Sequence, residues 1–176
     1  PWLFGNSRKF WICWENRKWY LDWLCENIPL DQTNEEEMYT LTIQEFRDNF
    51  GRGFVAHYKK FHKILPDLLP GIDWKIEEME KGGSFGKYGK GKANQTRLFH
   101  LVRRLFPEYE VLLDKYHSEI INPLTGEELQ LDVWVQVTDG LKDLAFEYQG
   151  EGMHEAPDVI ERDKIKVNKC PKLGII

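Results

Sequence analysis

The stretch LAFEYQG, residues 144–150, has the pattern of a β-strand with one polar face. Side chains along a strand point alternately to its two faces, so Glu147 and Gln149 share a face. The opposite face is apolar and carries Leu144, Phe146 and Tyr148. A carboxylate and an amide on an otherwise apolar strand, directly before a glycine, indicate a functional site at the end of this strand.

A second alternating segment precedes it. LQLDVWVQV, residues 129–137, places apolar residues on one face and Asp132 on the other. The short turn TDG joins the two segments, so we expect them to pair as antiparallel neighbours. If both apolar faces pack on the same core, Asp132, Glu147 and Gln149 converge on the other face.

Two carboxylates a few ångströms apart repel each other, and one of them takes up a proton unless a cation lies between them. Mg²⁺ suits such a place, since it binds one or two carboxylates and keeps several waters. The same ion lowers the pKa of a bound water and stabilises charge on a phosphodiester. The pattern therefore predicts a site for a hard divalent ion such as Mg²⁺, in which Mn²⁺ can substitute.

The strands belong to a larger predicted unit, residues 95–176, which we expect to be an α/β domain with a mixed sheet. An amphipathic helix over 95–107 opens it, and one or two strands follow over 109–121. Residues 157–170 have a helical pattern, and 173–176 begin a last strand that is cut short. The inward face of the first helix is predicted to consist of Leu98, Leu101, Val102 and Leu105.

The N-terminal region, residues 1–78, is predicted to be a small helical module. Thr42 and Glu45 have the spacing of a capping box and predict a short helix that ends near Asn49. A further helix is expected over 54–65, and the FGRG turn between the two suggests a helix-turn-helix that contacts DNA. The basic face of this second helix would consist of Arg52, Lys59, Lys60 and Lys63.

Residues 79–94 are rich in Gly and Lys and lack an apolar period, so we expect a linker. Nowhere in the 176 residues does a run of apolar positions approach 18, which argues against a membrane span. Three cysteines without a C-x-x-C pair favour free thiols in a reducing intracellular compartment, and leave nucleus or cytoplasm open. The chain starts without Met, so we expect a fragment or a processed product.

Charge is unevenly distributed along the chain. The net charge of -5 disfavours a nucleic-acid partner for the whole chain, and residues 21–50 carry eight acids against one arginine. Residues 81–118 are basic and adjoin the predicted site, which makes them the better candidates for contacts with DNA phosphates. The predicted nucleic-acid contacts of this region are Lys90, Lys92, Arg97, Arg103 and Arg104.

The order of these motifs resembles a known family. Asp132-x-Trp, then FEYQG, then RD..K on the following helix are similar to the PD-(D/E)XK nuclease superfamily, nearest its very-short-patch-repair-like branch. The resemblance covers about residues 92–176 and implies a restriction-endonuclease-like mixed sheet flanked by helices. The N-terminal module resembles Trp-rich helical modules that precede such domains and have no agreed activity. The whole chain is thus expected to be α+β, or α/β in its second half.

The resemblance also implies roles for individual residues. Asp132 and Glu147 would ligate Mg²⁺ together with the backbone carbonyl of Tyr148. Gln149 would take the place of the motif's usual Lys, and Lys166 would supply the positive charge that Gln149 lacks. Further candidates, which depart from the family pattern in residue type or spacing or lie on the following helix, are Gln95, His154, Arg162 and Asp163.

Three functional hypotheses stay open at this point. The first is a Mg²⁺-dependent endonuclease acting on DNA, as a monomer or a homodimer. The second is a domain that kept the fold and binds nucleic acid without cleaving it, which the two Gln substitutions motivate. The third is a protein-interaction scaffold, motivated by the acidic segment 21–50. Taken singly, each polar residue above has a bland explanation as a solvated surface group.

Overall fold

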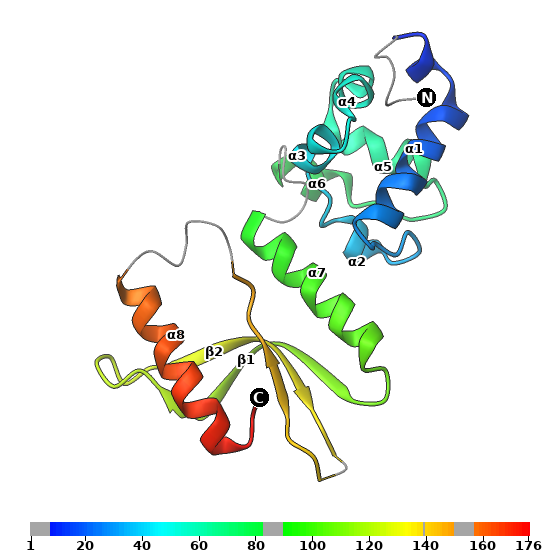
Figure 1. Ribbon diagram of the computed structural model, residues 1–176. Coiled ribbons are helices and arrows are strands. Elements are labelled where there is room, and N and C mark those ends of the chain that lie inside the picture. The colour runs from blue at the N-terminus through cyan, green and yellow to red at the C-terminus, as the bar shows by residue number, and fades with distance from the viewer. Residues whose placement is uncertain (1–7, 83–89, 139, 150–156) are drawn as a thin grey trace. The chain divides into compact units, whose positions relative to one another are not determined.

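The computed structural model of the protein describes residues 8–82, 90–138, 140–149 and 157–176 (Figure 1). Contacts between residues divide the chain into two compact units, Pro1–Ala93 and Asn94–Ile176. The described part combines α-helices with a three-stranded antiparallel sheet, so the α+β expectation is confirmed. No helix in this part has the length and apolar character that crossing a membrane requires.

The first unit is helical, as its sequence predicted. Helix α1 ends two residues before Pro29, and its buried face includes Tyr20, Leu21 and Leu24. Buried side chains of the other elements complete a single core around this face. The elements are η1 (Phe10–Ile12), α1 (Trp14–Asn27), α2 (Glu35–Met38), α3 (Ile43–Asp48), α4 (Arg52–Tyr58), η2 (Phe61–Lys63), α5 (Ile64–Leu68) and α6 (Ile76–Gly82).

Aromatic rings form the centre of this core. Phe46 and Phe54 stack with ring centroids 5.1 Å apart, and Trp11 meets Phe54 edge-on at 5.6 Å. Tyr20 is fully buried among them, and its hydroxyl donates to the carbonyl oxygens of Phe46 and Asn49 at 3.1 and 2.9 Å. Because a buried hydroxyl needs such partners, these bonds fix the end of α3 against α1.

The predicted capping box is present, but the prediction of one continuous second helix for the helix-turn-helix is wrong. Thr42 and Glu45 exchange both capping hydrogen bonds at the start of α3. The helix expected over 54–65 is broken, because α4 ends at Tyr58 and Lys59 adopts a left-handed φ of 60°. Lys60 and Lys63, the predicted DNA contacts here, therefore lie on the broken connection and on η2 and do not form one helix face.

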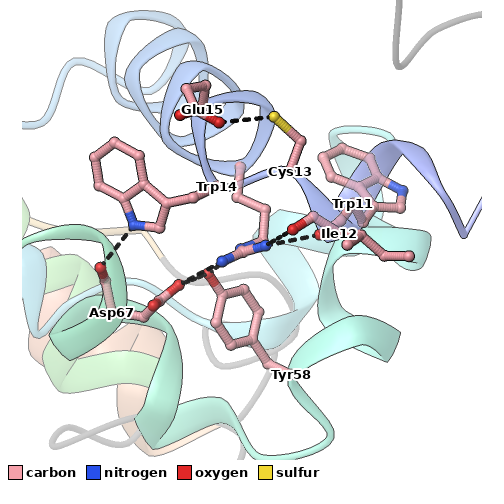
Figure 2. Close-up of polar contacts among 8 residues, drawn as sticks. Trp11, Ile12, Cys13, Trp14, Glu15, Tyr58 and Asp67 are labelled. Carbon is pink, nitrogen blue, oxygen red and sulfur yellow. Dashed lines mark hydrogen bonds and ion pairs between the residues drawn. The ribbon is translucent and has the colours of Figure 1, made fainter.

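A buried arginine holds the N-terminal segment to the rest of this unit (Figure 2). Arg17 Nη1 donates to the carbonyl oxygens of Trp11 and Ile12 at 2.9 and 2.8 Å. Its Nε donates to the Tyr58 hydroxyl at 2.8 Å, and its Nη2 donates to Asp67 at 3.1 Å. The Tyr58 hydroxyl donates in turn to Asp67 at 2.5 Å. One guanidinium thus joins η1, α1, α4 and α5.

We expect Gly51→Ala to destabilise this unit by about 1–3 kcal/mol, the usual cost of overpacking a core. A Cβ at Gly51 would lie 2.6 Å from the Phe46 carbonyl oxygen and against the hydroxyl of Tyr20. Thermal unfolding followed by circular dichroism measures the change. The matched control is Gly71→Ala, where a Cβ meets nothing within 4 Å. Equal melting temperatures for the two variants would contradict the packing described here.

The second unit is built on one sheet, whose strands lie in the order β1-β2-β3 with antiparallel neighbours. Its elements are α7 (Lys90–Leu105), β1 (Glu110–Ile121), β2 (Glu128–Gln136), β3 (Leu144–Phe146), α8 (Pro157–Lys169) and η4 (Cys170–Leu173). Part of the linker predicted over 79–94 is therefore helical instead, since α6 and α7 extend into it.

The end of the chain adds a fourth chain segment to the sheet. Ile175 forms a parallel bridge with Asp143 at the edge of β3. Two further hydrogen bonds support it, from Ile176 N–H to the Asp143 carbonyl at 2.8 Å and from Ala145 N–H to the Ile176 carbonyl at 2.7 Å. This parallel bridge lies outside the three named strands, which are all antiparallel, so the mixed sheet expected from residues 173–176 stays a prediction.

Two separate apolar clusters lie against the sheet. In one, Val102 of α7 packs with Val133 and Val135 of β2, which are fully buried. In the other, side chains of α8, η4 and Ile175 pack with Trp134 and Ala145. Helices therefore cover both faces of the sheet. The polar residues Asp132 and Glu147 lie in β2 and directly after β3. Leu105, predicted to point inward, is instead 63% exposed at the end of α7.

Candidate active site

The pairing of β2 with β3 brings the predicted polar residues to one place. Val133 pairs with Phe146 in this register, and continuing it by one pair sets Asp132 opposite Glu147. The backbone N–H of Tyr148 donates to Asp132 Oδ2 at 2.8 Å, which fixes the chain just beyond β3. The side-chain alternation of the two segments, taken from sequence, is thus realised in the sheet.

Helix α7 contributes two amide side chains to the same place. Gln95 Nε2 donates to Asp132 Oδ1, so both oxygens of this carboxylate accept hydrogen bonds. The preceding residue, Asn94, donates through Nδ2 to the Tyr148 hydroxyl at 2.6 Å. Sequence reasoning missed Asn94 because the residues before it are rich in Gly and Lys and were assigned to a linker. Its position beside Gln95 was the available signal.

Helix α8 contributes a cation. Lys166 Nζ lies 2.7 Å from Glu147 Oε2, and the side chains are 15% and 27% exposed. The other carboxylate oxygen, Glu147 Oε1, is buried and has no hydrogen-bond donor in the part of the chain that the structure describes. A buried carboxylate oxygen without a donor is costly in free energy. Glu147 is therefore half satisfied by the protein itself.

The electrostatics of Glu147 follow from this environment. Burial raises the pKa of its carboxyl group, and the negative charge of Asp132 adds to the rise. The hydrogen bond and the charge of Lys166 act in the opposite direction and lower this pKa. Because the folded-state pKa lies above the unfolded value, the stability that Glu147 contributes is present at low pH and is lost as pH rises through the folded pKa.

If Asp132 and Glu147 hold a metal ion, these opposing effects on the pKa of Glu147 predict how its binding depends on pH. Protons compete with a metal ion for Glu147, so we expect Mn²⁺ affinity to fall, as pH is lowered, at a higher pH than for an ordinary glutamate. Lys166→Met removes the charge that favours the ionised form and should move this fall to still higher pH. Calorimetric titrations with Mn²⁺ across a pH series measure both curves. Identical curves for the parent and the Lys166 variant would contradict the assignment of Lys166.

The remaining predicted residues are less closely connected to this site. Gln149 is exposed directly after it, and Arg162 lies on α8 with an ion pair to Asp158 at 3.6 Å. Asp163 is half-buried on the same helix. His154 lies outside the described residues, as does the side chain of Lys90.

The basic residues of α7 are spread along the helix. Lys92 and Arg97 flank Asn94 and Gln95, whereas Arg103 and Arg104 lie in the last turn. At about 1.5 Å per residue, the last turn is roughly 12 Å further along the helix axis from Gln95. Along the helix axis, Arg97 therefore lies closer to Gln95 than Arg103 and Arg104 do.

The residues present fit a hard divalent cation with few protein ligands. No group of three or more His, Cys, Asp or Glu side chains suited to a metal ion occurs within the described ranges. Mg²⁺ does not need such a cage, since one or two carboxylates with waters suffice. Asp132, Glu147 and the Tyr148 carbonyl are oxygen ligands of the required kind, and the unpaired Glu147 Oε1 is an acceptor without a protein donor.

Comparisons of the chain with protein-family models, with curated proteins and with solved structures find no match.

Proposed function

We propose that the second unit is a metal-dependent endonuclease domain that hydrolyses DNA phosphodiesters. The observation that carries the proposal is the buried Glu147 oxygen without a donor, beside Asp132 and Lys166. Glu35 Oε1 of the first unit is also buried without a donor, but Glu147 differs from it because a second carboxylate, Asp132, lies on the adjacent strand and acts on its charge. An oxygen-binding cation supplies the missing partner.

The chain's own residues take distinct roles in this proposal. Asp132 and Glu147 would hold Mg²⁺, or Mn²⁺ in its place, with the Tyr148 carbonyl. When bound, the ion supplies a water of lowered pKa and stabilises charge on the phosphate. Lys166 lowers the pKa of Glu147 against the effect of burial, and Gln149, which is exposed after the strand, orients water or phosphate.

The architecture of the unit supports the same proposal. The resemblance to PD-(D/E)XK nucleases implies a mixed sheet flanked by helices, with the site at a strand end. Here α7 and α8 pack on the sheet, and the three groups that meet at the site come from β2, the end of β3 and α8. The basic residues of α7 supply contacts for the DNA backbone.

The proposal is tested by a nuclease assay in Mg²⁺ and in Mn²⁺ on duplex, branched and single-stranded DNA, with Asp132→Ala in parallel. We expect the parent to cleave at least one substrate and the variant to cleave none. The matched control is Asp158→Ala, because this carboxylate is 77% exposed on α8 and should not affect cleavage. Unchanged cleavage by the Asp132 variant would sink the assignment.

A nucleic-acid-binding domain without cleavage is the second candidate. It is favoured by the neutral amides of Gln95 and Gln149, since neither can act as an acid or a base at the site. It predicts salt-sensitive DNA binding with no turnover under either ion. Multiple-turnover cleavage by the parent protein would exclude it.

A further inference from the structure

The turn between α3 and α4 contains an aromatic residue in a conformation that disfavours it. Phe50 has a φ of 65°, in the left-handed region that glycine and asparagine adopt most easily. It follows the C-cap of α3, where Gly51 N–H donates to the Phe46 carbonyl at 2.7 Å and closes the helix end. A glycine at this position would form the same turn without steric cost.

Burial of the ring does not compensate for this conformation. The Phe50 side chain is 55% exposed, although residues on either side of it are anchored. The Asn49 carbonyl accepts from the buried Tyr20 hydroxyl at 2.9 Å, and Gly51 is itself buried. The turn is therefore held from beneath, and it presents an aromatic ring to solvent in a fixed backbone. Strained residues held in this way occur preferentially at functional sites.

The segment that contains this turn, residues 47–63, is basic, although the unit as a whole is not. Five exposed basic side chains occur between residues 47 and 63, against one exposed acidic side chain, Asp48. Asp48 is engaged by Gln44, whose amide donates to it at 2.7 Å. None of the five basic side chains has an ion-pair partner within the described part of the chain. They are Arg47, Arg52, Lys59, Lys60 and Lys63.

We infer that Phe50 is a stacking site for an unpaired nucleic-acid base, with exposed arginines and lysines of the segment 47–63 on the phosphates. An exposed aromatic ring among cations is the arrangement by which proteins bind single strands, because every base offers a π-face and every nucleotide a negative charge. An apolar protein partner would leave five cations unpaired. The site lies in the first unit and does not depend on the metal site of the second.

The test is the affinity of the full chain for a fluorescent oligothymidylate of about 12 nucleotides, measured by anisotropy in EDTA. We expect Phe50→Gly to weaken binding about 5- to 100-fold, the equivalent of one lost base stack. The same substitution should raise the melting temperature by about 2–4 °C, because glycine relieves the left-handed strain. Opposite signs for binding and stability distinguish a binding residue from a structural one.

Three further variants sharpen the result. Phe50→Asn removes the ring but tolerates the left-handed φ, and should weaken binding like the glycine variant. Phe50→Trp keeps a ring and should retain binding. Leu124→Ser removes an apolar side chain that is 84% exposed in the second unit, and should change nothing. The inference is overturned if the glycine and asparagine variants bind the oligonucleotide as tightly as the parent does. It is also overturned if the parent binds no single strand, or if Phe50 proves to be needed only for binding a protein.

Discussion

We expect Glu147→Ala to reduce metal-dependent DNA cleavage on the order of 10³-fold or more. A catalytic metal ion stabilises the transition state by several kcal/mol, and each 1.36 kcal/mol corresponds to a factor of ten in rate. Glu147 offers a buried carboxylate oxygen without a donor in the described part of the second unit, so its loss removes a ligand that no neighbouring side chain replaces. Single-turnover cleavage with saturating enzyme measures the loss without interference from product release.

The controls for this prediction separate lost chemistry from lost structure. Glu147→Gln keeps the shape of the side chain and removes its charge, so it should be nearly as inactive while folding like the parent. Glu161→Ala changes an exposed glutamate on the following helix and should cleave normally. Near-ultraviolet circular dichroism checks the fold of each variant. A folded Glu147→Gln protein that cleaves within a few-fold of the parent would show that the site lies elsewhere.

The second large effect concerns stability. We expect Arg17→Leu to destabilise the first unit by about 3–5 kcal/mol, because it removes a buried guanidinium and leaves several of its acceptors unpaired, at about 1–3 kcal/mol each. Asp67 loses its cation, and the carbonyl oxygens of Trp11 and Ile12 lose their donor (Figure 2). At about 2–4 °C per kcal/mol, the melting temperature should fall by roughly 10 °C. Differential scanning calorimetry on the full chain measures this change.

Two variants place this result in context. Arg47→Leu removes an exposed arginine from α3 and should change stability by no more than about 0.5 kcal/mol. Tyr58→Phe removes the hydroxyl between Arg17 and Asp67 and should cost about 0.5–1.5 kcal/mol, the usual value for a hydrogen bond. If Arg17→Leu melts with the Arg47 variant, the guanidinium does not hold η1 to the helices.

The sheet and the convergence of its polar residues could be predicted because strand alternation has a fixed period of two. Asp132 and Glu147 were assigned to the polar faces of adjacent strands. The short turn between these strands then allows few pairing registers that also pack Val133 and Phe146 into the core. Strand alternation does not predict which carboxylate oxygens of Asp132 and Glu147 accept hydrogen bonds. That depends on side chains that arrive from α7 and α8, far away in the sequence.

The start of α7 was missed for a physical reason. Gly and Lys before Asn94 have weak or exposed-surface preferences, and composition alone predicts a linker there. Tertiary contacts override this, since Ala93 is fully buried and Asn94 and Gln95 each donate to a residue near the sheet. Most helical stability in proteins comes from such packing and not from propensity.

The helix expected over 54–65 failed in another way. Its apolar period was correct as a record of burial, because Phe54, Phe61 and Leu65 are all buried. Periodicity does not report continuity, however, and the three short helices α4, η2 and α5 present the same stripe to the core. The break depends on Lys59 in a left-handed conformation. Gly or Asn at this position would have indicated such a conformation, but the residue is a lysine.

The central claim is that Asp132 and Glu147 together hold a divalent cation. The most direct test is calorimetric titration of the metal-free protein with Mn²⁺ at neutral pH, with the Asp132→Asn, Glu147→Gln double variant measured alongside. The account predicts one binding event per chain for the parent and its loss in the double variant, with both proteins folded. A parent that gives no binding heat, or a double variant that binds Mn²⁺ as the parent does, would contradict it.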